Sequence, residues 1–176
     1  MEVKSLAIVA AGLLAMGCAG LMMDVKEADR AKSNIVLKHG DQVSLAEPEV
    51  KYIEEEFSKE DAARVAKLLK ADLAKELAEN KVTVASDAEK KIYVKVTNYE
   101  KGCGFCRGFF PLFGLGDSAI DGEVELEADG QKRKLVVQKT GQASGTSQMG
   151  DQTETNADYF ASVVVGRLTG ARKKEK

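Results

Sequence analysis

A strict alternation of side chains from Ile120 to Ala128 restricts the fold more than any other feature of this sequence. Apolar residues and one glycine occupy every second position, and acidic residues occupy the positions between them. Asp129-Gly130 follows at once, and this dipeptide favours a type I′ turn, in which both central residues have positive φ. Lys134–Thr140 supplies the return strand. The stretch therefore predicts a β-hairpin with one buried and one solvated face.

Basic residues of the return strand follow the acids of the first strand. We expect ion pairs across the hairpin from Lys132, Arg133, Lys134 and Lys139. Exposed pairs of this kind contribute only about 0.2–1 kcal/mol each. Another half-buried strand is predicted where Ile92, Val94 and Val96 alternate with polar residues, and short β-like runs are found at Asn34–Leu37, 50–53 and Lys81–Ala85.

Two amphipathic helices are predicted beside these strands. The first has Ser58 as N-cap, with Asp61 at the N3 position, and it runs over 59–79 before Asn80. Its apolar stripe recurs every three or four residues and consists of Ala62, Val65, Ala66, Leu69, Leu73 and Leu77.

The second helix is expected to be capped by Thr155 with Asp158, and to end before a C′ glycine at Gly170. Its apolar face consists of Ala157, Phe160, Ala161, Val164 and Leu168. A chain of 176 residues suits one domain with a real core. We therefore predict a single α+β domain over 34–170, a two-layer sandwich in which two helices cover one face of a mainly antiparallel sheet of about five strands.

The N-terminus has the pattern of an export signal. Lys4 supplies a positive charge, Leu6–Leu14 is an apolar run, and small residues then lead into Cys18. Leu14-Ala15-Met16-Gly17-Cys18 resembles a bacterial lipobox. That resemblance implies cleavage before Cys18 and acylation of its thiol by chains such as palmitate, each buried methylene adding about 0.8 kcal/mol of membrane binding.

Two other interpretations of the N-terminus stay open. The uncharged run Leu6–Met23 has 18 residues, the lower limit for an uncleaved membrane helix, and a cleaved soluble protein is the third possibility. On the lipoprotein interpretation, residues 1–17 are the signal peptide, 18–33 a lipid-anchored tether without strand pattern, and 171–176 a basic tail. Ala19 follows the cysteine, and resemblance to enterobacterial lipoproteins then favours the periplasmic face of the outer membrane.

Cys103 and Cys106 remain as a pair once Cys18 is assigned to the lipid. In an oxidising compartment we expect them to form a short-loop disulfide. A thiol–disulfide enzyme needs its cysteines at the start of a helix, and Gly and Pro follow Cys106 instead. Zinc needs three or four ligands, and two cysteines with the single His39 do not supply a second close pair.

The segment after the cysteines is rich in phenylalanine. Its candidate interaction residues are Phe105, Arg107, Phe109, Phe110, Leu112, Phe113 and Leu115. Such a segment either covers an open end of the core or forms an exposed apolar patch that binds a partner or a membrane.

Composition excludes several other functions. The net charge of −2 gives no electrostatic basis for binding nucleic acid, and the absence of Trp leaves little for stacking bases. Ser144, Thr146 and Ser147 have no base beside them in sequence, so no nucleophilic site is indicated. We expect no catalytic residue, no metal site and no cofactor.

From Lys91 onward the order of segments resembles a family of small bacterial lipoproteins known only as a domain of unknown function. The family has a strand, an Arg-containing loop, an apolar stretch punctuated by Gly, an alternating strand, a turn, a return strand, a Gly-rich stretch and a helix. In this sequence the corresponding segments, in the same order, are Ile92–Tyr99, Arg107, Phe109–Gly116, Ser118–Ala128, Asp129-Gly130, Lys134–Thr140, Gly141–Gly150 and Asp158–Leu168. The cysteine pair departs from that pattern, so no functional residue is carried over. The strand and helix order also resembles the amino-terminal domain of TolB, a likeness of fold that does not determine function.

These observations favour a non-enzymatic envelope lipoprotein that binds a protein partner, as an accessory of an outer-membrane or secretion assembly. The alternatives are a periplasmic thiol–disulfide protein or sensor that uses Cys103 and Cys106, and a purely structural spacer. A reduction potential below about −300 mV would indicate a structural bridge, and a higher one a labile bridge.

The lipid assignment predicts the mature N-terminus. We expect mass spectrometry to find an N-terminal peptide that begins at Cys18 and carries acyl chains. An unmodified peptide that contains residues 1–18 would contradict the lipobox.

Overall fold

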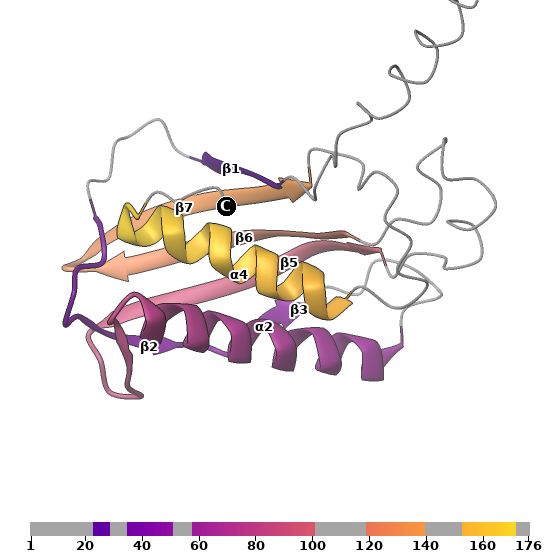
Figure 1. The fold of residues 1–176 in the computed structure, drawn as a ribbon, viewed down its shortest axis with the longest axis horizontal. Helices are drawn as coiled ribbons and strands as arrows, with labels where there is room; N and C mark the ends of the chain where they lie inside the picture. Colours follow the sequence, from indigo (N-terminus) through magenta and orange to yellow (C-terminus); the bar gives the residue numbers. More distant parts are fainter. Residues whose placement is uncertain (1–22, 29–34, 51–57, 101–118, 140–152, 172–176) are drawn as a thin grey trace, which may run out of the picture.

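The computed structural model describes residues 23–28, 35–50, 58–100, 119–139 and 153–171. Within these ranges it has seven strands and two helices: β1 (Met23–Glu27), β2 (Gln42–Leu45), β3 (Glu49–Val50), α2 (Lys59–Glu79), β4 (Thr83–Val84), β5 (Lys90–Glu100), β6 (Ala119–Ala128), β7 (Gln131–Lys139) and α4 (Thr153–Thr169). Helices α2 and α4 pack against each other on one face of the sheet (Figure 1). The two-layer α+β prediction is confirmed.

The strands form one open sheet in the order β1-β7-β6-β5-β2-β4, and β3 also pairs with β5. The pairs β1–β7, β7–β6 and β6–β5 are antiparallel. The short strands β2 and β3 run parallel to β5, and β4 runs parallel to β2. The sheet is therefore mainly antiparallel, with a parallel margin on one side.

The predicted hairpin is confirmed in detail. Asp129 and Gly130 have φ values of 53° and 70°, the left-handed conformation that a type I′ turn requires. Along β6 every second residue is buried against the helices, from Ile120 through Val124 to Ala128. The acids between them are half-buried on the other face.

Helix α2 begins and ends where the sequence predicts. The Ser58 hydroxyl accepts a hydrogen bond from the Asp61 backbone N–H at 3.0 Å, and the Asp61 carboxylate accepts one from the Ser58 N–H at 3.4 Å. This capping box satisfies N–H groups that have no partner within the helix. Asn80 is the C-cap, and the apolar stripe from Val65 to Leu77 is buried.

Helix α4 differs from its prediction at the N-terminus. It begins at Thr153, so Thr155 lies inside the first turn and does not cap the helix. The predicted apolar face is buried, including Phe160, and Gly170 has a φ of 68°, as a C′ glycine should. Thr153 also makes a tertiary contact, described below, that local pattern does not show.

Three strand predictions also need correction. Residues 19–33 show no strand pattern in the sequence, yet Met23–Glu27 form β1 at the edge of the sheet. Residues 35–37 of the predicted run Asn34–Leu37 are not in a strand. Strand β2 was missed, although Val43 and Leu45 alternate with polar residues and are buried.

No helix in the described ranges has the length and apolar character needed to cross a membrane.

The packing of β6 under α4 leads to a stability prediction. A Cβ at Gly122 would lie 2.9 Å from the Lys95 carbonyl oxygen and 3.2 Å from the Phe160 ring. Since backbone cannot easily move there, we expect Gly122→Ala to lower the free energy of unfolding by about 1–3 kcal/mol. Gly166→Ala is the matched control, because its Cβ meets only the Ala171 carbonyl oxygen, at 3.3 Å, near the end of the described chain. Equal urea midpoints for both variants would contradict the close packing.

Candidate functional site

The residues that the sequence singles out lie outside the described ranges. This holds for Cys18, for Cys103 and Cys106, and for the interaction residues Phe105, Arg107, Phe109, Phe110, Leu112, Phe113 and Leu115. The structure does show where the described chain meets each of these segments. The predictions about these residues therefore stay predictions, but the points at which their segments join the described chain are known.

These points of attachment lie at one end of the sheet. Glu100, the last residue of β5, pairs with Ala119, the first of β6, so segment 101–118 leaves and returns on neighbouring strands. At the same end Met23 begins β1 and pairs with Lys139, the last residue of β7. We call this end, defined by Met23, Glu100, Ala119 and Lys139, the entry end (Figure 1).

The opposite end of the sheet holds the tight connections. It carries the Asp129-Gly130 turn and the turn at His39 and Gly40, where the Gly40 N–H donates to the Lys81 carbonyl at 2.9 Å. His39, the single histidine of the chain, is therefore a turn residue.

A buried hydroxyl pair joins the two layers near the entry end. The Tyr99 hydroxyl lies 2.6 Å from the Thr153 hydroxyl, and Thr153 is fully buried. Tyr99 is near the end of β5 and Thr153 is the first residue of α4, so this contact links the end of the strand to the start of the helix. The sequence offered no signal for it, since the two residues are separated by 54 positions.

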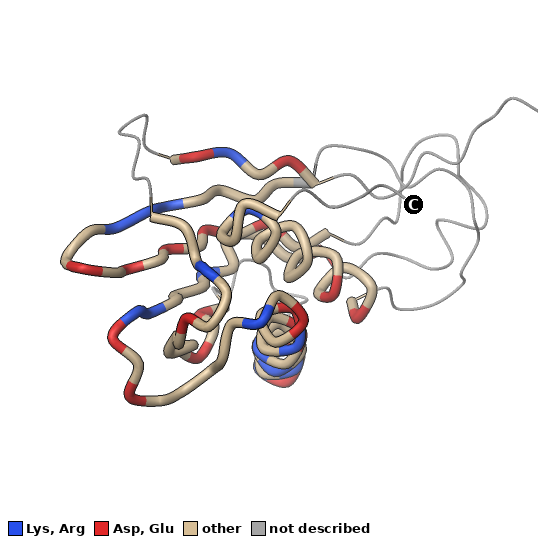
Figure 2. The backbone as a smooth tube through the Cα atoms, turned by 60° about the vertical axis from the view of Figure 1, so that its left-hand side comes forward, with Lys and Arg blue, Asp and Glu red and all other residues tan. Residues whose placement is uncertain are grey.

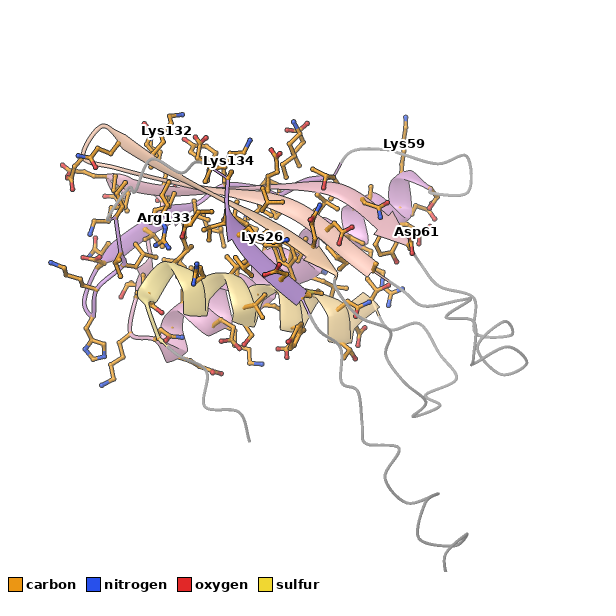
Figure 3. All side chains as sticks on the ribbon, turned by 90° about the horizontal axis from the view of Figure 1, so that it is seen from above. Lys26, Lys59, Asp61, Lys132, Arg133 and Lys134 are labelled. Atoms are coloured by element: carbon orange, nitrogen blue, oxygen red, sulfur yellow. The ribbon has the colours of Figure 1, made fainter. Side chains whose placement is uncertain are left out.

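Arg133 corrects another prediction. The sequence placed it with the basic residues that pair with the acids of β6, yet it points to the helix side of the sheet, while Lys132 and Lys134 point away (Figure 3). The alternation of β7 explains this, because Arg133 shares a face with the buried Leu135 and Val137. This alternation was the available signal in the sequence. An arginine at an inward position of the strand needs partners beneath the helices.

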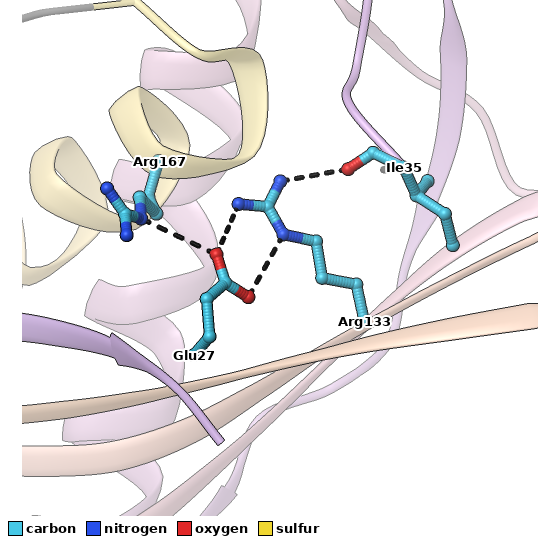
Figure 4. Close-up of polar contacts among 4 residues, drawn as sticks. All are labelled: Glu27, Ile35, Arg133 and Arg167. Atoms are coloured by element: carbon cyan, nitrogen blue, oxygen red, sulfur yellow. Dashed lines mark hydrogen bonds and ion pairs between the residues drawn. The ribbon is translucent and has the colours of Figure 1, made fainter. Parts of the chain in front are cut away.

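The guanidinium of Arg133 is held by two groups from separate segments, the Glu27 carboxylate and the Ile35 carbonyl (Figure 4). Its Nη2 is 2.6 Å from Glu27 Oε1 and its Nε is 3.3 Å from Glu27 Oε2, a two-pronged contact with β1. Its Nη1 donates to the Ile35 carbonyl at 2.8 Å. Arg167 of α4 approaches the same carboxylate, with Nε 3.5 Å from Oε1. We call Glu27, Ile35, Arg133 and Arg167 the edge cluster.

Electrostatics favour the charged form of Glu27. The hydrogen bonds from Arg133 lower the pKa of Glu27 below its ordinary value; burial opposes this, and the charges of Arg133 and Arg167 reinforce it. The Arg133 side chain is only 9% exposed, and a buried positive charge is unfavourable without an opposite charge beside it. The Glu27 carboxylate supplies that opposite charge. The edge cluster joins β1, the segment that contains Ile35, strand β7 and helix α4. Its residues contact one another and are arranged as a structural contact.

The other face of the sheet is charged and solvated. Acidic positions recur along β6 and basic positions along β7 (Figure 2). Lys132 lies 2.7 Å from Glu125, and Lys134 lies 2.8 Å from Glu123, as the sequence predicts for the hairpin. These pairs are exposed and add little to stability.

A shallow hollow lies on this solvated face. Its volume is about 280 Å³, and it is lined by Glu47, Glu49, Tyr93, Val94, Lys95, Glu123, Glu125 and Lys134. Tyr93 is 39% exposed there. Among the described residues, no group of His, Cys, Asp or Glu side chains is placed to hold a metal ion. The hollow has mixed charge and shows no preference for one class of ligand.

No family model and no curated protein matches the chain. Among solved structures, the chain is similar to the PelC dodecamer from Paraburkholderia phytofirmans, at 16% identity and a TM-score of 0.49, covering 80% of this chain and 96% of that one. It is similar to a Xanthomonas campestris protein of DUF330, a domain of unknown function, at 13% identity and a TM-score of 0.45, covering 73% and 85%. A hypothetical protein from Chlamydia trachomatis has 8% identity and a TM-score of 0.40, covering 74% and 91%. No activity or residue role is carried over from them.

The edge cluster predicts a pH dependence. Because the folded-state pKa of Glu27 is lowered, its carboxylate stabilises the fold above the ordinary glutamate pKa of about 4.3, and this contribution is lost as the pH falls through the folded-state pKa. The difference in free energy of unfolding between the wild type and Glu27→Gln should therefore shrink in acid. Urea unfolding at several pH values measures it.

The control for this experiment is Asp24→Asn on the same strand. It removes an exposed pair in which Lys26 Nζ lies 2.9 Å from the Asp24 carboxylate, and we expect a change within about 0.5 kcal/mol at neutral pH. A difference between the wild type and Glu27→Gln that is constant from neutral to acid pH would rule out the proposed role of the Glu27 charge.

Proposed function

We propose that the chain is a non-enzymatic, lipid-anchored protein of the bacterial cell envelope that acts by binding a protein partner. The residues Leu14-Ala15-Met16-Gly17-Cys18, with the preceding apolar run, support the anchor. The proposed location is the periplasmic face of the outer membrane, and the proposed partner is part of an outer-membrane or secretion assembly.

The observation that carries the proposal is the shared entry end. Cys18 precedes Met23 by only five positions, a length that spans at most about 17 Å when extended. An acylated Cys18 would therefore keep the entry end close to the membrane surface. Segment 101–118 leaves the sheet from the same end, between Glu100 and Ala119.

This geometry defines the end of the domain at which the phenylalanine-rich segment is attached. Phe105–Leu115 belongs to the segment that is attached on the anchored side of the domain. We propose that it binds a partner at that membrane, since a long apolar segment at a surface is typical of an interaction site.

The basic tail 171–176 is attached at the other end of the domain. Helix α4 starts at the entry end and has 17 residues, which correspond to about 25 Å. Gly170 therefore lies at the end of the domain that holds the turns, where a Cβ would contact Val36. This placement favours a solubilising role for the tail over contact with the membrane of the anchor.

For Cys103 and Cys106 we propose a structural disulfide. A helix that lowers a thiol pKa has to begin at the cysteines, and Gly108 and Pro111 follow Cys106 in the sequence instead. Intact mass after alkylation of the native exported protein tests the bridge, and two freely alkylated thiols would exclude it.

A double variant tests the binding role of the segment. In the full-length protein in native envelopes, Phe110→Ser with Phe113→Ser should abolish cross-links to neighbouring proteins, because the apolar contacts are lost. The protein should stay in the membrane fraction, and its urea midpoint should not change.

Two controls separate the possible causes. Tyr93→Ser alters the solvated sheet face and should leave the cross-links intact. Cys18→Ser should release the protein from the membrane if the anchor is lipid. Unchanged cross-links in the double-serine variant, together with a lowered urea midpoint, would show that the segment serves only the core.

A further inference from the structure

Strand β1 is held to the domain by its pairing with β7, by two partly buried side chains and by the edge cluster. It lies at the edge of the sheet, and among the described strands it pairs only with β7. None of its five side chains is fully buried, and Met23 and Val25 pack against the margin of the core. Elements with so few buried contacts open locally at lower free energy than the core does.

The edge cluster makes the seating of β1 a single event. Glu27 closes the far end of the strand, where the next residue, Ala28, donates its N–H to the Lys134 carbonyl at 2.9 Å. If β1 leaves, Arg133 loses its carboxylate while its charge stays beneath the helices. Because that charge is unfavourable without a partner, partial detachment is disfavoured and the strand is either seated or released.

Release would change the connection between the anchor and the domain. With β1 seated, the first described residue after Cys18 is Met23, at the entry end. With β1 released, the first described residue that still contacts the rest of the domain is Ile35, which packs against the core and whose carbonyl accepts a hydrogen bond from Arg133 Nη1 at 2.8 Å. The number of positions from Cys18 to that contact then grows from five to 17, which correspond to about 17 Å and about 58 Å of extended chain.

We propose that β1 is a releasable strap, locked by Glu27 and Arg133, that sets how far the domain can move from its membrane. Seated, it keeps the entry end within a short reach of the anchor. Released, it lets the domain move away and turn, and it leaves the edge of β7 from Leu135 to Lys139 without a neighbouring strand. The change in reach rests on the proposed lipid anchor, whereas the release of β1 is a property of the fold alone.

Hydrogen exchange measured by mass spectrometry on the full chain in detergent tests the release. In the wild type, amides of β1 should exchange faster than those of the central strands β5 and β6. Glu27→Gln should accelerate exchange in β1 and along β7 by about tenfold or more, equivalent to the loss of one good ionic contact, and leave β5 and β6 unchanged. Asp24→Asn should leave every strand as in the wild type.

Two results would overturn the strap. One is equal protection of β1 and β6 in the wild type, because β1 would then open only with the whole domain. The other is uniform acceleration of all strands in Glu27→Gln, because the cluster would then serve global stability alone.

A disulfide lock guards against a variant that misfolds. Lys26 and Val136 are register partners, so Lys26→Cys with Val136→Cys can bridge β1 to β7 in a chain that also carries Cys103→Ser and Cys106→Ser. Oxidation should slow exchange in β1 to the rate of β6, and reduction should restore it. No difference between the two redox states would show that β1 does not open locally.

The change in reach is measured on supported bilayers by the distance from the lipid surface to a dye on the domain. Glu27→Gln should increase that distance and its spread, and the oxidised lock should reduce both to the lowest values. If exchange shows release while the mature N-terminus carries no lipid, the strap stands and the proposed anchor fails. If the lipid is present and β1 never opens, the anchor stands and the strap fails.

Discussion

Arg133 places a permanent positive charge under the helix layer, and the edge of the sheet is built around it. A guanidinium cannot lose its proton in a protein, so a buried one needs hydrogen-bond acceptors around it. Glu27 supplies the carboxylate and Ile35 supplies a carbonyl, and Arg167 adds a second cation to the same carboxylate. The first strand, the segment after it and the end of α4 are therefore joined by one ionic contact.

The two ends of the domain have different connections, and the difference bears on function. Two-residue turns close the end that holds Asp129-Gly130 and His39-Gly40. The entry end instead receives the chain from Cys18 and attaches segment 101–118. A lipid at Cys18 would hold the entry end, and with it the attachment of the segment that we propose as the binding element, near the membrane, with β1 as the link between the anchor and the sheet.

Much of the architecture could be predicted because it rests on local pattern. The capping box of Ser58 and Asp61, the stripe of α2 and the Asp129-Gly130 turn each depend on residues close in sequence. The buried face of α4 follows from its periodicity in the same way. The failures share the opposite property: β1 has little pattern of its own and is a strand because β7 and the edge cluster hold it.

The candidate binding residues were predicted from composition alone and stay predictions, whereas Arg133 and Glu27 were missed as a pair. They are separated by 106 positions, so no spacing rule connects them. Only the inward parity of Arg133 in β7 indicated that this arginine needed a buried partner. The identity of that partner required the sheet order, which places β1 next to β7.

The sequence by itself determined the α+β class, the helices with most of their ends, the hairpin and the export pattern, since periodicity, capping and turn chemistry act over a few residues. Tertiary structure decided which strand lies at the edge, which face receives Arg133, and that the chain from Cys18 and segment 101–118 attach at the same end of the domain. These features depend on contacts between residues far apart in the chain. Such contacts form only when the sheet has assembled, because only then is the charge of Arg133 buried and in need of the opposite charge of Glu27.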